Sequence, residues 1–381
     1  MKSILDAAID RHEESQKFKQ MIEQKQGSGE MKAPPTSADD DELRKLADSL
    51  RISIKIVGCG GGGSNTITRM YDEGITGAEM CAINTDAPHL LHVHSPRKVL
   101  IGQHITRGLG AGAIPQVGAE AAKESEQQLR SFIDKSNVVF VTAGMGGGTG
   151  TGSAPMVAKI AKETGALVMG VVTLPFTGEG KARMENALWG LQQLVRYCDT
   201  TITIPNDKLL ELVPKLPIEA AFKVADEILV QTIRGITEIV TKPGLVNLDY
   251  SDIQTIMKDG GVAMVGIGES DSDRNRIEEA VQAALHCPLL GEMNLSEAKG
   301  ALVRVVGGHD MTISEAEKAA EMVTSSVSPN ARVIWGCSID PTMEKTVQIL
   351  LILTGVKSEH LKGKDAIVVD AGKKSGIDLV R

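Results

Sequence analysis

Aromatic residues make up only 3% of the 381-residue sequence, and no hydrophobic run approaches the roughly 18 to 20 residues that a membrane-spanning helix needs. The N-terminus lacks both an apolar stretch and a small-residue cleavage site, so we expect no secretory signal. No CxxC pair occurs among the five scattered cysteines, which favours reduced thiols over disulfides or structural zinc. These absences predict a cytoplasmic protein without a membrane span.

An excess of positive charge is also missing. Lys and Arg number 41 against 49 Asp and Glu, which gives a formal net charge of −8. A chain with this balance has no general electrostatic attraction for nucleic acid or anionic lipid, so we expect no nucleic-acid partner. Glycine is instead abundant, with 40 residues. Its placement is the main indication of function.

From residue 52 onward, apolar strand-like segments alternate with helix-length segments. Helices are expected to start near Asn65, to run from Pro115 to Lys135, and to start near Ser153. Strands are expected at 52–60, 78–86, 137–148 and 166–176. This alternation predicts βαβ units and an α/β fold with a doubly wound, mainly parallel sheet. Ligands of such a sheet gather at the carboxyl ends of its strands.

A long helix and a second domain are expected further along the chain. Residues after Pro217 are apolar on nearly all sides for about 25 positions, which predicts a long buried helix. Later segments, among them a buried strand at Ile349–Leu353 and helices near Asp273–His286 and Ser314–Ser325, predict a second, smaller α/β domain. The expected parts are a helical arm (1–26), a linker (27–50), a first α/β domain (51–216), a central core helix (217–242), a C-terminal domain (243–357) and a tail (358–381).

A first glycine loop lies directly after the strand expected at 52–60. Gly58, Gly60 and Gly63 satisfy GxGxxG, and Asp86 lies at the end of the next strand. Residues without a β-carbon let backbone N–H groups approach a phosphate, which the N-terminus of the following helix also stabilises. The alternative is a tight turn without a ligand. By itself the motif does not separate NAD from other nucleotides.

A second glycine loop, GGGTGTG at 146–152, again follows a strand and precedes a helix. Two such loops on one sheet can surround a polyphosphate, and Thr149 and Thr151 add hydroxyl donors. An NAD enzyme has no use for this second loop. A Walker motif is absent, because GEGK at Gly178–Lys181 lacks the leading glycine. Phosphate charge is then met by backbone amides, Mg²⁺ and Arg183.

Several motifs together resemble one family. GGGTGTG is the signature of the tubulin and FtsZ superfamily, and INTD (Ile83–Asp86), TRGLGAG (Thr106–Gly112), IPNDKL (Ile204–Leu209) and PGLVNLDYSDI (Pro243–Ile253) follow the order of the FtsZ family. The resemblance to these bacterial and archaeal cell-division GTPases, closer than that to tubulin, runs from Ile52 to Val356. It implies a tubulin/FtsZ-like fold with a GTPase sheet, GTP or GDP as ligand, and self-assembly into filaments.

The resemblance implies a set of nucleotide-binding residues. Its phosphate positions match Gly61, Gly62, Gly63, Ser64, Ala111, Gly112, Gly148, Thr149 and Gly150, its ribose positions match Glu179 and Arg183, and its base positions match Asn65, Asn206, Phe222 and Asp226. Mg²⁺ is then bound through the phosphates, with no direct protein ligand. The residues alone leave alternatives open, because Glu179 and Arg183 have the spacing of a surface ion pair and Phe222 is typical of a core.

The catalytic residues implied by the resemblance lie in NLDYSD, where the matches are Asn247, Asp249 and Asp252. This loop follows a helix of about 25 residues, so it is expected roughly 35 to 40 Å from the helix start and out of reach of its own nucleotide. In the family such a loop docks on the nucleotide of the next subunit, head to tail. Without the family, the same segment reads as a helix N-cap.

The implied biology is a division ring in the cytoplasm, at the division site. Its partners are further copies of the chain and membrane-linked adaptors, the latter bound through the tail, where GIDLVR loosely resembles a docking peptide. One departure is notable: Ile114 replaces the Asn of GAGxNP in many relatives. The alternatives are an NAD-dependent dehydrogenase, a scaffold that binds GTP without hydrolysing it, and a tubulin-like protein of cell shape.

Overall fold

The computed structural model describes residues 52–212, 218–241, 249–291, 294–341, 343 and 345–356. The expected arm (1–26), linker (27–50) and tail (358–381) lie outside the described residues, as does Asn247.

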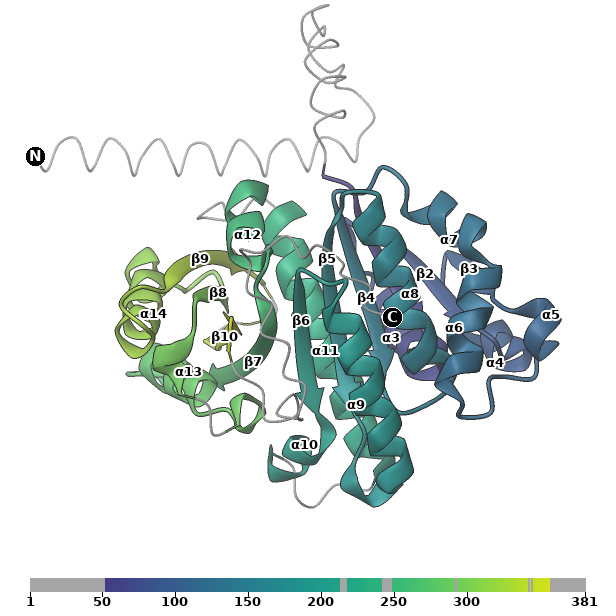
Figure 1. Cartoon of the computed structure of the whole chain (residues 1–381). Helices are drawn as coiled ribbons and strands as arrows, with labels where there is room; N and C mark the ends of the chain where they lie inside the picture. The colour runs from purple at the N-terminus through teal and green to yellow at the C-terminus, as the bar shows by residue number, and fades with distance from the viewer. Residues whose placement is uncertain are drawn as a thin grey trace, which may run out of the picture. The chain divides into compact units, whose positions relative to one another are not determined.

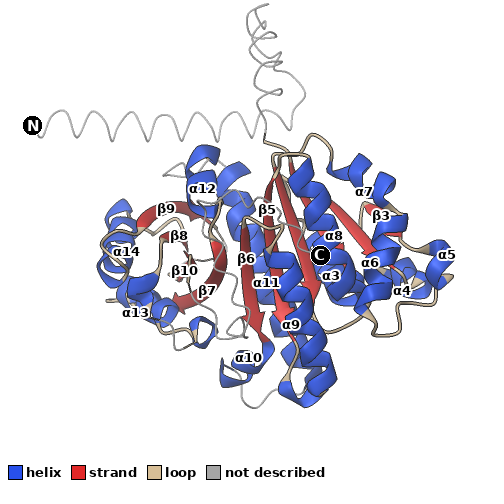
Figure 2. Cartoon of the chain, in the orientation of Figure 1, coloured by secondary structure: helices blue, strands red, loops and turns tan. Residues whose placement is uncertain are grey.

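The described strands form one ten-stranded sheet (Figures 1 and 2). Their order across the sheet is β3 (Arg97–Leu100), β2 (Glu79–Asn84), β1 (Ile54–Cys59), β4 (Val138–Gly144), β5 (Leu167–Leu174), β6 (Thr200–Pro205), β7 (Gly261–Ser270), β10 (Val347–Thr354), β8 (Gly300–Gly307) and β9 (Arg332–Ile339). The six strands from β3 to β6 are all parallel. Their order, 3-2-1-4-5-6, confirms the doubly wound sheet and places its switch point between β1 and β4.

Helices cover the sheet and connect its strands. The described helices are α3 (Gly60–Asp72), α4 (Ala87–His92), α5 (Gln103–Thr106), α6 (Pro115–Glu124), α7 (Glu126–Ile133), α8 (Thr149–Glu163), α9 (Lys181–Val195), α10 (Asn206–Leu212), α11 (Ile218–Thr241), α12 (Tyr250–Met257), α13 (Arg276–Leu285) and α14 (Ile313–Ser326). Short 3₁₀ turns lie at η1 (Thr177–Glu179), η2 (Pro288–Leu290) and η3 (Leu295–Glu297).

Three expected helix boundaries are wrong. The first helix begins at Gly60 rather than near Asn65, and α8 begins at Thr149 rather than near Ser153. Gly60 to Gly63 form the first turn of α3, and Gly150 and Gly152 lie in the first turn of α8 instead of a preceding loop. Tertiary packing overrides their low helix propensity. The helix expected from Pro115 to Lys135 is two helices that meet at Ser125.

The core lies on both faces of the sheet, because successive strand residues point to opposite sides. Ile56 is buried in the cluster that includes α3 and α11, while its neighbour Val57 is buried in the cluster that includes α6, α7, α8 and α9. The predicted long helix is confirmed as α11, with 24 residues. A helix of that length spans about 36 Å.

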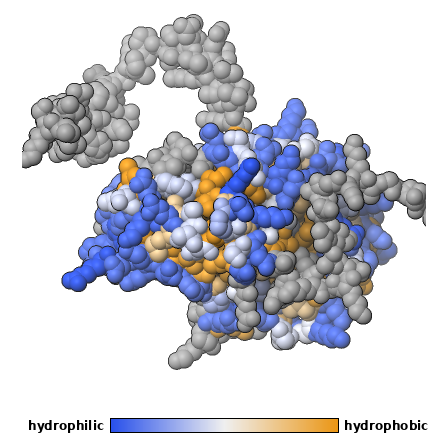
Figure 3. Space-filling view, turned by 60° about the vertical axis from the view of Figure 1, so that its left-hand side comes forward, coloured by the Kyte–Doolittle hydropathy of each residue, from blue (hydrophilic) through white to orange (hydrophobic). Residues whose placement is uncertain are grey.

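The C-terminal elements extend the same sheet. Strand β7 pairs with β6 at three register positions, and β10 lies antiparallel between β7 and β8. Helices α13 and α14 pack on these strands around a third apolar cluster. Figure 3 turns this part of the chain toward the viewer and shows hydrophobic residues reaching the surface between hydrophilic ones. The buried strand expected at Ile349–Leu353 is confirmed within β10.

The five cysteines are free, and four of them are buried, which agrees with the expected reduced thiols. Burial raises the pKa of the Cys59, Cys81 and Cys198 thiols, so they are poor nucleophiles. None of the helices in the described part of the chain is both long and apolar enough to cross a bilayer.

Candidate nucleotide-binding site

The two glycine loops lie side by side at the switch point of the sheet, after β1 and β4. A β-carbon on Gly60 would lie 2.6 Å from the backbone nitrogen of Gly150, and one on Gly63 would lie 2.4 Å from the carbonyl oxygen of Thr142. Such distances are too short for any side chain, so Gly60 is required by the close approach of α3 to the second loop and Gly63 by its close approach to β4. Gly61 differs, because its β-carbon would meet nothing closer than 3.9 Å.

A third loop, residues 107–114, closes on the second. A β-carbon on Gly148 would lie 2.8 Å from the Ile114 nitrogen and 2.9 Å from the Ala111 β-carbon. Arg107 and Ala113 have positive φ angles of 53° and 59°, which are uncommon for residues with side chains. The Asn186 side chain on α9 donates to the Ala113 carbonyl at 3.1 Å. The structure therefore brings the three expected phosphate loops to one place.

The two expected hydroxyl donors, Thr149 and Thr151, lie in the first turn of α8. Only the Thr149 side chain points toward the other loops. Thr149 Oγ1 is 2.6 Å from Thr85 Oγ1 at the end of β2. Thr151 is fully buried, and its Oγ1 accepts from the Gly146 N–H at 2.9 Å. The expectation that Thr151 donates to phosphate is wrong, because its hydroxyl stabilises the loop from inside. Ser64 Oγ, by contrast, is buried without a partner among the described residues.

The two expected ribose residues form an ion pair. Arg183 Nε lies 2.8 Å from Glu179 Oε2, and Glu179 Oε1 accepts from the Phe176 N–H at 2.9 Å. Glu179 belongs to η1 and Arg183 to α9, so they do not share one helix as the spacing suggested. The side chain of Arg183 covers Gly146 of the second glycine loop, where a β-carbon would lie 2.7 Å from Arg183 Cγ. The pair thus borders the phosphate loops, and its contact with ribose stays a prediction.

Three of the four expected base-binding residues come from α10 and α11, and the fourth, Asn65, is an exposed residue of α3. Asn206 starts α10, is buried, and its Oδ1 has no partner among the described residues. Phe222 on α11 is 40% exposed and meets the buried Phe176 ring edge to face, with centroids 5.1 Å apart. The alternative of Phe222 as a core residue is therefore wrong. An exposed aromatic face and an unpaired buried oxygen are features that suit a stacked, hydrogen-bonded base.

Asp226 lies one helical turn beyond Phe222 on α11. Burial raises the pKa of its carboxyl to about 6, although the charge of Arg69 and a hydrogen bond with Thr66 lower it. A half-buried carboxylate such as that of Asp226 accepts hydrogen bonds strongly and rejects a base edge without matching donors. Asp226 is therefore suited to reading the N–H groups of guanine.

The expected catalytic acids lie near the amino-terminal ends of the parallel strands, whereas the glycine loops follow the carboxyl ends. The Tyr250 hydroxyl at the start of α12 donates to the Asn137 carbonyl at 3.1 Å, and Asn137 directly precedes β4. The second glycine loop follows the other end of β4, about 20 Å away at the rise of a strand. In Figure 1 α12 lies at the top and α10 at the bottom. Asp249 and the pocket residues of one chain are therefore far apart.

Asp249 and Asp252 also have a local structural role. Asp249 is the exposed N-cap of α12, and its backbone N–H donates to Asp252 Oδ2 at 3.1 Å. The capping alternative is thus confirmed as a structural role. The catalytic role expected of Asp249 stays a prediction, and the exposure of this residue is compatible with it.

Several residues around the pocket have no counterpart among the sequence-based expectations. Thr85 contacts Thr149, Phe176 supports Phe222, Asn186 holds the third loop, and Arg69 joins α3 to α11. Thr85 lies in the INTD motif, which contained a signal for it, and Phe176 ends the strand segment expected at 166–176. Asn186 and Arg69 carry no local signal, since their partners are distant in sequence.

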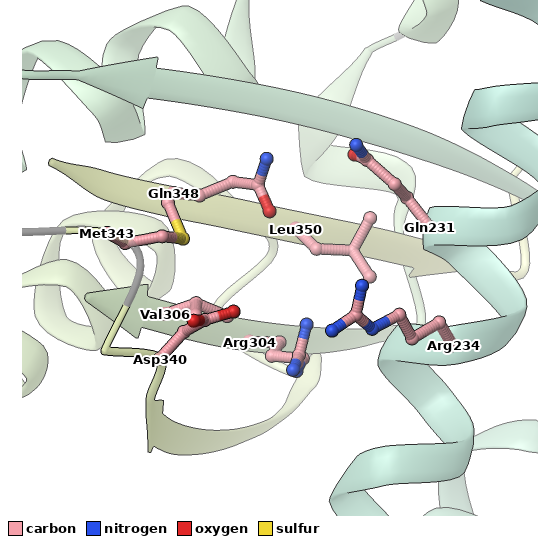
Figure 4. Close-up of a pocket in the computed structure, with 8 residues that line it drawn as sticks. All are labelled: Gln231, Arg234, Arg304, Val306, Asp340, Met343, Gln348 and Leu350. Atoms are coloured by element: carbon pink, nitrogen blue, oxygen red, sulfur yellow. The ribbon is translucent and has the colours of Figure 1, made fainter. Parts of the chain in front are cut away.

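A separate cavity of about 190 Å³ lies between α11 and the C-terminal strands (Figure 4). Arg234 and Arg304 border it, and both are paired with Glu238. Among the described residues no group of three or more His, Cys, Asp or Glu side chains could hold a metal ion. The pocket residues fit a nucleotide, because glycine loops supply amides for phosphate while Asn206 Oδ1 and Asp226 supply acceptors.

Comparison with known proteins agrees with this geometry. Residues 53–214 match the GTPase domain of the Tubulin/FtsZ family, and residues 261–357 match the C-terminal domain of the FtsZ family. The chain is 51% identical to cell division protein FtsZ 1 of Archaeoglobus fulgidus and 48% identical to cell division protein FtsZ of Haloferax mediterranei, with all of each chain covered in both cases.

Solved structures show the same likeness. An empty FtsZ dimer of M. jannaschii superposes with a TM-score of 0.80 at 51% identity, covering 84% of this chain and 93% of that one. GDP-bound CetZ1 of Haloferax volcanii superposes with a TM-score of 0.70 at 26% identity, covering 81% of this chain and 95% of that one.

Proposed function

The chain belongs to the FtsZ family of tubulin-like GTPases, and we propose that it forms head-to-tail filaments in which two subunits complete each GTPase site. One subunit contributes the pocket of glycine loops and base-reading residues. The next contributes Asp249 and Asp252, together with Asn247. The observation that carries this proposal is the position of Asp249 near the amino-terminal ends of the parallel strands, whereas the phosphate loops follow their carboxyl ends.

A head-to-tail contact accounts for that separation. A site whose two parts lie at opposite ends of the strands can act only when the nucleotide pocket of one copy meets Asp249 and Asp252 of another. Such a heterologous contact repeats without closing and generates a filament. The M. jannaschii relative has been solved as a dimer, which supports self-association in this family.

The nucleotide pocket of one subunit and the acidic residues of the next have different tasks in the mechanism. Backbone amides of the phosphate loops hold the triphosphate, and Arg183 adds positive charge beside them. Asp249 of the next subunit orients the attacking water and accepts its proton, with Asp252 holding the Asp249 backbone in place. Mg²⁺ would be held through the phosphates that the glycine loops bind, and it would supply neutralising charge there. Asp226 and Asn206 select the base.

The cellular role follows from the relatives, whose names describe cell division proteins. Filaments of this chain act as the division ring at the division site. Attachment to the membrane goes through adaptors that bind the tail, residues 358–381. These assignments are separate from the enzymology and are tested by localisation of a tail-truncated chain.

The decisive experiment mixes two inactive variants. Asp249→Ala keeps the pocket and should bind GTP, but its turnover should fall by about 10²- to 10⁴-fold. Asp226→Ala keeps the acids and should bind GTP poorly. In a mixture, contacts that join an intact pocket to intact acids form, so GTP turnover measured as released phosphate should exceed the sum of the two variants alone.

Two controls keep this test specific. Asp249→Asn preserves a good N-cap while removing the charge, so it separates lost catalysis from a loosened α12. Asp273→Ala removes an exposed acid elsewhere in the C-terminal domain and should leave turnover unchanged. If the mixture shows no recovery, or if wild-type turnover per molecule stays constant on dilution, each subunit has a self-contained site and the proposal is wrong.

A further inference from the structure

The side chain of Arg69 bridges the two helices that border the base end of the pocket. Arg69 lies on α3, one turn beyond Asn65, and its Nη1 donates to the Lys223 carbonyl of α11 at 2.8 Å. Its Nη2 lies 2.5 Å from Glu227 Oε2, also on α11. Its Nε donates to Glu73 Oε1 at 3.2 Å. All three guanidinium nitrogens are therefore engaged, two of them with α11.

The anchored turn of α11 is the one that carries the base-reading side chains. Lys223 directly follows Phe222, and Glu227 directly follows Asp226. A helix is rigid over one turn, so contacts that fix Lys223 and Glu227 also fix the directions in which the side chains of their neighbours Phe222 and Asp226 point. The contact spans 154 positions in the sequence. It sets where α11 lies along α3, whose first turn is the phosphate loop.

A planar guanidinium suits this task. Its donors form a fixed fork that engages a carbonyl and a carboxylate at the same time, which a lysine ammonium does not reproduce. Arg69 is 35% exposed and Glu227 31% exposed, so the ion pair by itself contributes little to stability. The geometry, rather than the strength of the pair, is what the fork provides.

On this basis, which rests on the nucleotide site of the proposed function, we propose that Arg69 is a positioning residue that sets Phe222 and Asp226 for guanine and thereby determines base selectivity. Arg69 does not touch the nucleotide in this role. It acts through α11, and its loss should reduce mainly the affinity that comes from the contact between Asp226 and the base.

Electrostatics supports the same role. Arg69 and Thr66 face Asp226 from α3, while Lys223 and Glu227 flank it on α11. Arg69 lowers the pKa of the Asp226 carboxyl against the opposing effect of burial. The ionised form accepts from both N1–H and the 2-amino group of guanine, whereas the protonated form loses an acceptor.

The test compares GDP with inosine diphosphate, which lacks the 2-amino group, on the full-length chain without polymerisation. The preference of the wild-type protein for GDP should be about tenfold or more, the value of one hydrogen bond to a charged group. Arg69→Gln should weaken GDP binding by about tenfold and bring the GDP-to-inosine ratio close to one. Arg69→Lys keeps the charge without the fork, so its ratio should be intermediate.

Three controls complete the design. Glu227→Gln removes the charge of the partner but keeps an acceptor oxygen for Arg69, and it leaves the bond to Lys223 intact. Because the geometry of the fork is preserved, its ratio should stay near the wild-type value. Arg196→Gln makes the same charge change at an exposed residue that directly follows α9 and should have no effect. Thermal unfolding checks that each variant is folded.

Equal losses of affinity for both nucleotides in Arg69→Gln and Arg69→Lys, at an unchanged ratio, would show a merely structural role and overturn the proposal. Because diphosphate binding requires neither turnover nor filaments, this outcome is distinct from a failure of the shared GTPase site. A wild-type chain that bound neither nucleotide would instead refute the nucleotide assignment on which both proposals rest.

Discussion

The two ends of the candidate pocket are built from different parts of the chain. The phosphate end consists mainly of backbone, in three loops whose glycines approach one another too closely for side chains. The base end consists of side chains, namely Asn206, Phe222 and Asp226, presented by α10 and α11. A phosphate is recognised by charge and amide geometry, whereas a base is recognised by its pattern of donors and acceptors.

This difference determines how each end should respond to change. Backbone amides do not titrate, so the phosphate end should be insensitive to pH but very sensitive to added volume. The base end should tolerate small changes of volume, because Phe222 is exposed, but should depend on the charge of Asp226. Each of the following experiments tests one side of this comparison.

The largest effect is expected from added volume at the phosphate end. Gly63→Ala places a β-carbon 2.4 Å from the Thr142 carbonyl oxygen and should destabilise the fold by about 3 kcal/mol. Gly61→Ala, two residues earlier in the same helical turn, places a β-carbon no closer than 3.9 Å to any neighbour and should be neutral or stabilising by up to about 1 kcal/mol. Denaturant unfolding measures both. Equal losses in the two variants would mean that the loops do not pack as described.

An intermediate effect is expected from pH at the base end. With the pKa of Asp226 at about 6, the carboxyl binds guanine in its ionised form above that pH and becomes protonated below it. GDP affinity should therefore fall by about tenfold between pH 7 and pH 5. Calorimetric titration at several pH values measures the change.

The matched variant for this experiment is Asp226→Asn. It cannot titrate, so its affinity should be weaker at pH 7 and flatter with pH than that of the wild type. A terminal phosphate itself titrates near pH 6, and the difference between the two proteins removes that contribution. Parallel curves for the two proteins would show that Asp226 does not face the base.

The smallest effect is expected at Ile114, where this chain has an apolar side chain in place of the Asn of the family motif GAGxNP. Ile114 is the N-cap of α6, 51% exposed, and makes no capping bond. Ile114→Asn should add a cap and stabilise the fold by about 1 kcal/mol. Chemical denaturation measures this gain. No gain, with a bound nucleotide lost, would indicate that the apolar side chain serves the phosphate loop instead.

The sequence predicted much of this site for identifiable reasons. The alternation of apolar segments predicted the doubly wound sheet, and the two glycine loops predicted a phosphate site at its carboxyl edge. The start of α3 at Gly60 and the inward hydroxyl of Thr151 were missed. The first depends on packing of α3 against the second glycine loop, which outweighs the local preference of glycine for a turn. The second depends on the fold of the loop itself and on α9, whose Gly190 packs against Thr151. Asn247 and the tail lie outside the described residues and remain predictions.

What the sequence determined by itself is the set of local patterns: the strands, the long helix α11, the glycine loops and the family to which the motifs point. Periodicity and turn chemistry act between neighbouring residues, so they can be read from order alone. Only the tertiary structure decided which of these parts meet. The contact of Arg69 with Lys223, the exposure of Phe222, and the distance between Asp249 and the phosphate loops all arise from packing between segments far apart in the chain.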